Sequence, residues 1–98
     1  MNIPIAAFER LLELLFNDYE YRREFQAVCL KHDGKGLLQK IAEYTIRYLR
    51  VAKEPATVAW KEAHAPSEAE EKRVYDLFVA YGSGFMAKRF QIKISEPL

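Results

Sequence analysis

The residues best suited to chemistry in this 98-residue chain are its one cysteine and its two histidines. Cys29 and His32 stand three residues apart, a spacing that puts both side chains on one face of a helix. A thiol beside an imidazole can lose its proton and act as a nucleophile, so a small thiol enzyme is one candidate function. Free cysteine is also among the most buried residue types and packs as a small apolar side chain. We favour the core interpretation and expect no enzymatic activity.

Metal and phosphate chemistry have weaker signals. The two histidines, His32 and His64, lie in different segments of the chain, which supplies too few soft ligands for a zinc-type site. The turn Asp33-Gly34-Lys35-Gly36 precedes a predicted helix but lacks the glycine–lysine spacing of a phosphate-binding loop. We therefore expect no metal and no cofactor, and we interpret this segment as a turn between helices.

Helices are the elements that must position these residues. The segment around residues 37–53 is free of glycine and proline, and its apolar residues cover about half of a helix at roughly 100° per residue. A stripe this wide can pack on two sides at once. The pattern predicts a mainly α fold, a compact bundle of four or five helices around a central helix at about 37–53. The length and uniform composition predict a single helical domain over residues 1–98.

Three further helices are predicted from capping and periodicity. The first covers Ile5 to Phe16, and the second runs from Asp18 to His32 with a narrower apolar stripe. Ser67-Glu68-Ala69-Glu70 matches a capping box and starts a helix that we expect to reach about Tyr81. Gly82-Ser83-Gly84 is expected to end it.

Two segments fit both a helix and a strand. Residues 56–63 could form a short helix, or Thr57 to Trp60 could form a strand. Residues 88–94 alternate polar and apolar side chains, which favours a short C-terminal β-strand. The helical spacing of Met86, Phe90 and Ile94 supports the alternative.

Composition limits the classes of function. The net charge is +1 and the isoelectric point is near 7.8, so no strong overall field attracts the chain to nucleic acid or to an anionic membrane. No apolar run reaches the roughly 18 residues of a membrane span, and no signal peptide is visible. One cysteine excludes an internal disulfide. These features predict a cytoplasmic protein that does not act at a membrane.

Basic residues give one alternative function. Lys40, Arg47 and Arg50 share the polar face of the predicted central helix, and Arg89 adds charge in the tail beside Phe90. Basic side chains spaced by aromatic ones can follow phosphates and stack on bases, which suggests a nucleic-acid-binding regulator.

Surplus apolar side chains give the interpretation that we prefer. Tyr19, Trp60, Phe90 and Ile92 exceed what a small single-layer core requires, and aromatic residues of this kind often anchor protein interfaces. We expect a small non-enzymatic protein-binding module, acting as an adaptor, a small subunit or an inhibitor. Its partner would be another protein or a second copy of itself in a homodimer. No motif in the sequence is specific enough to indicate a family.

Overall fold

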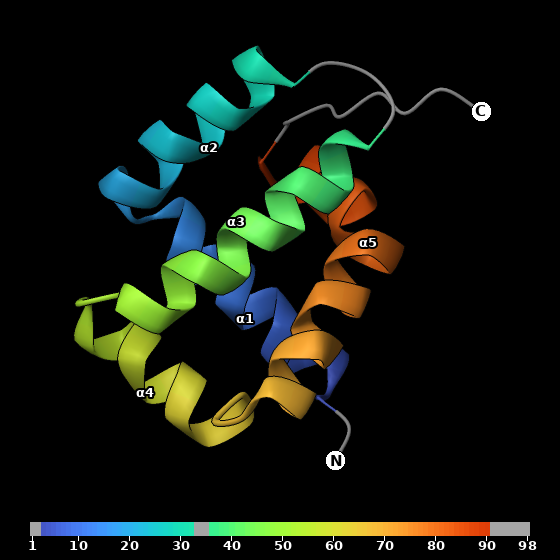
Figure 1. Cartoon of the computed structure of the whole chain (residues 1–98). Helices are drawn as coiled ribbons and strands as arrows, with labels where there is room; N and C mark the ends of the chain where they lie inside the picture. The colour runs from blue at the N-terminus through green and yellow to red at the C-terminus, as the bar shows by residue number, and fades with distance from the viewer. Residues whose placement is uncertain (1–2, 33–35, 91–98) are drawn as a thin grey trace.

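A computed structural model describes residues 3–32 and 36–90, and over these residues the fold is five helices without a strand. They are α1 (Ile5–Phe16), α2 (Tyr19–Lys31), α3 (Leu37–Val51), α4 (Pro55–His64) and α5 (Glu68–Phe90). Figure 1 shows α3 across the front of the molecule, with α2 on one side of it and α5 on the other. The predicted mainly α bundle around a central helix is confirmed.

The central helix α3 packs against three neighbours, α2, α4 and α5. Its buried face consists of Leu37, Leu38, Ile41, Ala42, Thr45 and Leu49. Gly36 precedes it with φ of +89°, a left-handed conformation that side-chain-bearing residues rarely adopt, so the turn into α3 favours glycine. This helix therefore fixes the relative positions of the elements on both of its sides.

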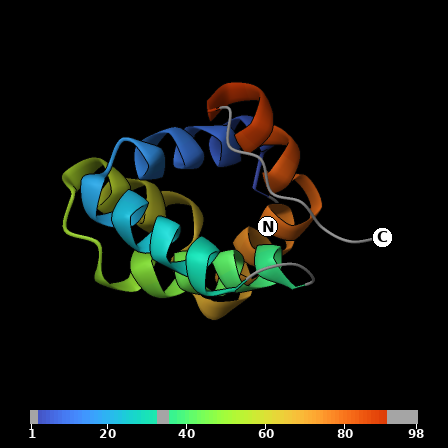
Figure 2. The same ribbon diagram turned by 90° about the horizontal axis from the view of Figure 1, so that it is seen from above.

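Helix α1 supplies the other half of the core. It packs against α2, α4 and α5 and buries Phe8, Leu11, Leu12, Leu15 and Phe16. The Phe8 ring meets Phe78 of α5 edge to face, with centroids 5.7 Å apart. Seen from above in Figure 2, α1 and the end of α5 lie on one side of the molecule, with α3 on the opposite side.

Tyrosines join α2 to α3. Tyr21 is fully buried, and its hydroxyl lies 2.8 Å from Thr45 Oγ1, which itself donates to the Ile41 carbonyl. Since the threonine proton is already used, Tyr21 is the donor in their hydrogen bond. The Tyr48 hydroxyl donates to Asp18, the residue that caps α2 by accepting from the backbone N–H of Glu20 at 3.0 Å. Burial, followed by the effect of the Asp18 carboxylate, raises the pKa of Tyr48.

Residues 57–60, which fit both a strand and a helix, lie within α4. Pro55 occupies its first turn, where a missing backbone N–H has little cost. Thr57 and Trp60 face inward, and the Trp60 indole N–H donates to the Ala7 carbonyl of α1 at 2.8 Å.

The predicted end of the last helix is wrong, and so is the start of the predicted strand. Helix α5 continues through Gly82-Ser83-Gly84 to Phe90, so positions 88–90 are helical. The reason is packing: Met86, two residues beyond this segment, is completely buried and holds the last turns against the core. This burial outweighs the cost of about 1 kcal/mol that each helical glycine carries. Positions 91–94 of the predicted strand lie outside the described residues.

Helix α5 starts after Ser67 as predicted, but the reciprocal side-chain-to-backbone hydrogen bonds that define a capping box are not found among the described residues. The Ser67 hydroxyl donates to the Glu70 carboxylate rather than joining a backbone group, with 3.0 Å to Oε2. The backbone N–H of Glu71 donates to the Ser67 carbonyl and closes the first turn. The acidic first turn of α5, with Glu68, Glu70 and Glu71, also complements the helix dipole.

Candidate functional site

A buried carboxylate holds three helices together at the start of α5. Glu71 is only 6% exposed, and Arg50 of α3 binds it through Nη2 at 2.8 Å and through Nε at 3.3 Å. Lys61 of α4 lies 3.3 Å from the other carboxylate oxygen and also donates to the Ala65 carbonyl at 2.9 Å. The hydrogen bonds from Arg50, and then that from Lys61, hold the pKa of Glu71 below its usual value despite burial. Glu71 is therefore ionised at neutral pH and fixes the spacing of α3, α4 and α5 at this end.

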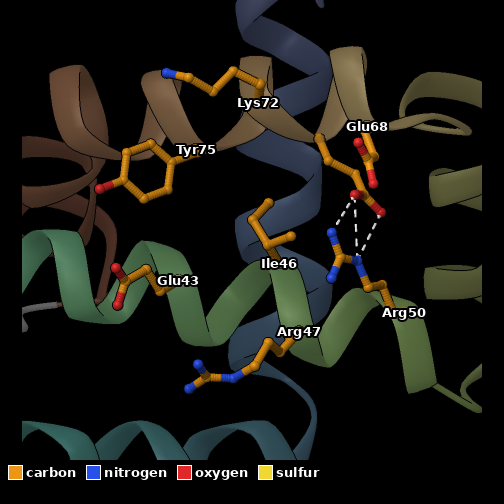
Figure 3. Close-up of a pocket in the computed structure, with 8 residues that line it drawn as sticks. Glu43, Ile46, Arg47, Arg50, Glu68, Lys72 and Tyr75 are labelled. Atoms are coloured by element: carbon orange, nitrogen blue, oxygen red, sulfur yellow. Dashed lines mark hydrogen bonds and ion pairs between the residues drawn. The ribbon is translucent and has the colours of Figure 1, made fainter.

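Beside this ion pair, an open groove of about 760 Å³ runs between α3 and α5. Figure 3 shows Ile46 and Tyr75 projecting into it from the two helices, with Arg50 reaching across to α5 at one end and Glu43 near Tyr75 at the other. Ile46 and Tyr75 are half-buried, so the groove has an apolar centre between charged ends.

The charges along the groove have both signs in equal number. Glu43, Glu68 and Glu71 are its acidic residues, and Arg47, Arg50 and Lys72 are its basic residues. Lys72 pairs with Asp76 at 2.7 Å and lies over the Tyr75 ring, 5.4 Å from the centroid. Figure 3 shows Arg47 pointing from α3 away from α5, and no partner for it is found within the described part of the chain. A groove lined by both acidic and basic residues can bind a surface that also carries charges of both signs.

The four predicted interface residues differ in their exposure to solvent and in whether the structure describes them. Tyr19 is exposed over 75% of its surface, and its role at an interface stays a prediction. Trp60, in contrast, is buried, with only 6% of its surface exposed, and its indole N–H donates to the Ala7 carbonyl of the same chain. Its expected place on the surface is therefore wrong, and it belongs to the core of the isolated chain. Phe90 is placed as the last residue of α5, but its side chain and the whole of Ile92 lie outside the described part.

Two of the four basic residues suggested for nucleic acid are engaged with carboxylates. Arg50 binds Glu71, and Lys40 lies 3.6 Å from Glu43 on its own helix. Arg47 is exposed, and the side chain of Arg89 is among those not described. The outer face of α3 is therefore a surface of mixed charge rather than a basic one.

Thiol and metal chemistry gain no support from the geometry. Burial raises the pKa of the half-buried Cys29 thiol, which favours the unreactive protonated form. Among the residues described, no group of three or more His, Cys, Asp or Glu side chains is arranged to hold a metal ion.

The residue that the sequence interpretation missed is Glu71. Its place in the acid-rich first turn of α5 gives no sign of burial, because its partners are ten and twenty-one residues away. No local pattern in the sequence marks such a contact.

Comparison with protein families, with curated proteins and with solved structures found no match. In the described helices, none is long and apolar enough for a membrane crossing.

Proposed function

We propose that this protein is a small non-enzymatic protein-binding module, an adaptor, small subunit or inhibitor, that binds a helix of a partner protein in the groove between α3 and α5. The observation that carries the proposal is the composition of this groove, in which Ile46 and Tyr75 form an apolar centre between rims of mixed charge.

The expected occupant follows from the shape and the charges. Two neighbouring helices form a furrow that accepts a third helix, and an apolar side chain of that helix would cover Ile46 and Tyr75. Arg47, on the α3 side of the groove, favours an acidic residue on the partner, while Lys72 and Glu43 contribute less because each is paired within this chain. The Arg50–Glu71 pair would remain intact, since it sets the width of the groove.

The test uses a photo-cross-linking amino acid placed at Lys72, on the α5 rim of the groove, and separately at Lys53, an exposed position outside the groove. Both proteins are incubated with a native lysate, irradiated and examined by mass spectrometry. We expect one protein to cross-link from position 72 and not from position 53. With the cross-linking amino acid at position 72, the charge reversal R47E should strongly reduce this cross-link, whereas the control K53E should keep it. A set of cross-linked proteins that is the same at both positions would exclude the groove as the binding site.

Nucleic-acid binding by Lys40, Arg47, Arg50 and Arg89 remains the alternative, with less support because Glu43 and Glu71 neutralise two of these cations. It predicts binding to mixed-sequence DNA or RNA at low salt with a steep loss as salt rises. The absence of binding at low salt would exclude it.

A further inference from the structure

The outer face of α2 has no partner within the described part of the chain. Tyr21 and Phe25 bury the inner face of α2 against α1 and α3. On the opposite face Tyr19 is 75% exposed and Leu30 is 88% exposed, the two highest values among the large exposed apolar residues. Figures 1 and 2 show α2 at the edge of the fold with no other helix on its outer side.

The residues of this face have the spacing of a coiled-coil seam. Tyr19, Arg23, Gln26 and Leu30 follow one another at intervals of four, three and four residues, and all four are exposed. Alternating steps of four and three residues are those of the a and d positions in a heptad repeat, which keep one helix face in contact with a second helix. At about 1.5 Å per residue, the two apolar side chains stand roughly 16 Å apart on the same face, one near each end of the helix.

The arrangement is complementary to itself under a twofold axis. When two copies of α2 run antiparallel, Tyr19 of each copy lies against Leu30 of the other, and Arg23 lies opposite Gln26. In a parallel pair, Arg23 would face Arg23 of the second copy, which is unfavourable. The sequence of the seam thus selects the antiparallel orientation.

Charges beside the seam favour the same orientation. Glu20 and Lys31 are both exposed and lie at opposite ends of one edge of the seam, about 20° apart around the helix. In the antiparallel pair this edge meets its own copy, so that Glu20 of each chain comes within reach of Lys31 of the other. Arg23, near the axis, has a carboxylate of its own chain at hand, since its Nε lies 4.0 Å from Glu24.

We propose that the chain forms a homodimer in which the outer faces of two α2 helices pack antiparallel. This proposal goes beyond the binding groove, which lies between α3 and α5, away from the outer face of α2. The dimer therefore carries two free grooves. One short helix from each copy gives an interface at the small end of the range for specific association. We expect a dimer that dissociates on dilution through the micromolar range.

Sedimentation equilibrium of the full chain over a wide concentration range is the first test. The wild type should show a monomer–dimer equilibrium, and Leu30→Glu should weaken it at least about tenfold, since the apolar contact is lost twice in each dimer. Val51→Glu is the matched control, because Val51 is also exposed (69%) but lies at the end of α3, outside the seam. Far-UV circular dichroism checks that each variant is folded.

A charge exchange tests the orientation. Glu20→Lys and Lys31→Glu should each weaken the dimer several-fold, because each creates two like-charge contacts. The double variant E20K/K31E should recover most of the lost affinity. A wild type that stays monomeric at millimolar concentration would overturn the proposal. Equal dimer affinities of Leu30→Glu and Val51→Glu would also overturn it. So would an affinity of the E20K/K31E dimer that is no higher than that of the weaker single variant.

Discussion

At the scale of single residues, the ionised Glu71 side chain is the polar group on which the arrangement of α3, α4 and α5 depends. Its carboxylate is buried, and hydrogen bonds from Arg50 and Lys61 on two other helices compensate for the lost contact with water. Replacing Glu71 by Gln keeps the shape but removes the charge, leaving Arg50 and Lys61 without their counter-ion. We expect the free energy of unfolding at pH 7 to fall by about 1–2 kcal/mol, a value reduced by the exposure of Arg50 to solvent. Chemical denaturation measures it directly.

The same substitution should have a characteristic pH dependence. Because the pKa of Glu71 is lower in the folded state than in the unfolded chain, ionisation stabilises the fold above its usual pKa of about 4.3. This stabilisation is lost as the pH falls through the lowered folded-state pKa. The difference between the wild type and Glu71→Gln should therefore be full at pH 7 and shrink below about pH 4. Asp76→Asn is the control, since its pair with Lys72 is exposed and should contribute less than about 0.5 kcal/mol at any pH.

At the scale of the helices, the continuation of α5 through Gly82 and Gly84 can be tested with a matched pair of substitutions. A Cβ at Gly84 would meet no atom within 4 Å, so Gly84→Ala should stabilise the protein by about 0.5–1 kcal/mol through helix propensity alone. At Gly82 the added Cβ would lie 3.0 Å from Cδ1 of Phe78, a ring that is completely buried.

Because the Phe78 ring cannot move away without disturbing the core, Gly82→Ala should be less stable than Gly84→Ala by about 1 kcal/mol or more. Thermal unfolding of both variants gives the comparison. If Gly84→Ala left the melting temperature unchanged or lowered it, the helix would not be continuous at this point.

Helix-scale features were the part of the structure that the sequence predicted well. Asp18 and Ser67 signal the starts of two helices, and the wide apolar stripe at 37–53 predicts the central one, because these signals depend only on neighbouring residues. The end of α5 could not be predicted in this way. Local propensity at Gly82-Ser83-Gly84 favours a stop, and the opposing influence is the burial of Met86 by residues distant in the sequence.

The candidate site residues also differ in whether neighbouring residues or distant contacts determine their exposure. The exposure of Tyr19 and Leu30 could be anticipated, since both fall outside the apolar stripe of their own helix. The burial of Trp60 could not, because its partner is the Ala7 carbonyl, fifty-three residues away. The groove also depends on a distant contact, between Arg50 and Glu71. Pairings between helices leave no periodic trace in a single sequence.

At the scale of the whole molecule, the described helices share one hydrophobic core, with buried residues from α1 to α5 in a single cluster. We therefore expect one cooperative unfolding transition. Trp60 is the only tryptophan, and it lies against α1 from its position on α4, so its fluorescence reports the docking of these two helices. Denaturation curves from tryptophan fluorescence and from far-UV circular dichroism should coincide. A fluorescence change at lower denaturant than the loss of helix would show that α4 detaches before the rest unfolds.

The order in which the helices that pack on α1 are synthesised has a consequence for folding of the nascent chain on the ribosome. Helix α1 is made first, but two of the three helices that cover it, α4 and α5, are made last. A nascent chain that has exposed only its first three helices leaves much of the Phe8 side of α1 open to water, because Phe78 and Trp60 are still inside the exit tunnel or not yet joined. The Phe8 side of α1 stays uncovered until α4 and α5 have left the ribosome, and during that interval α1 is the segment that a chaperone would meet.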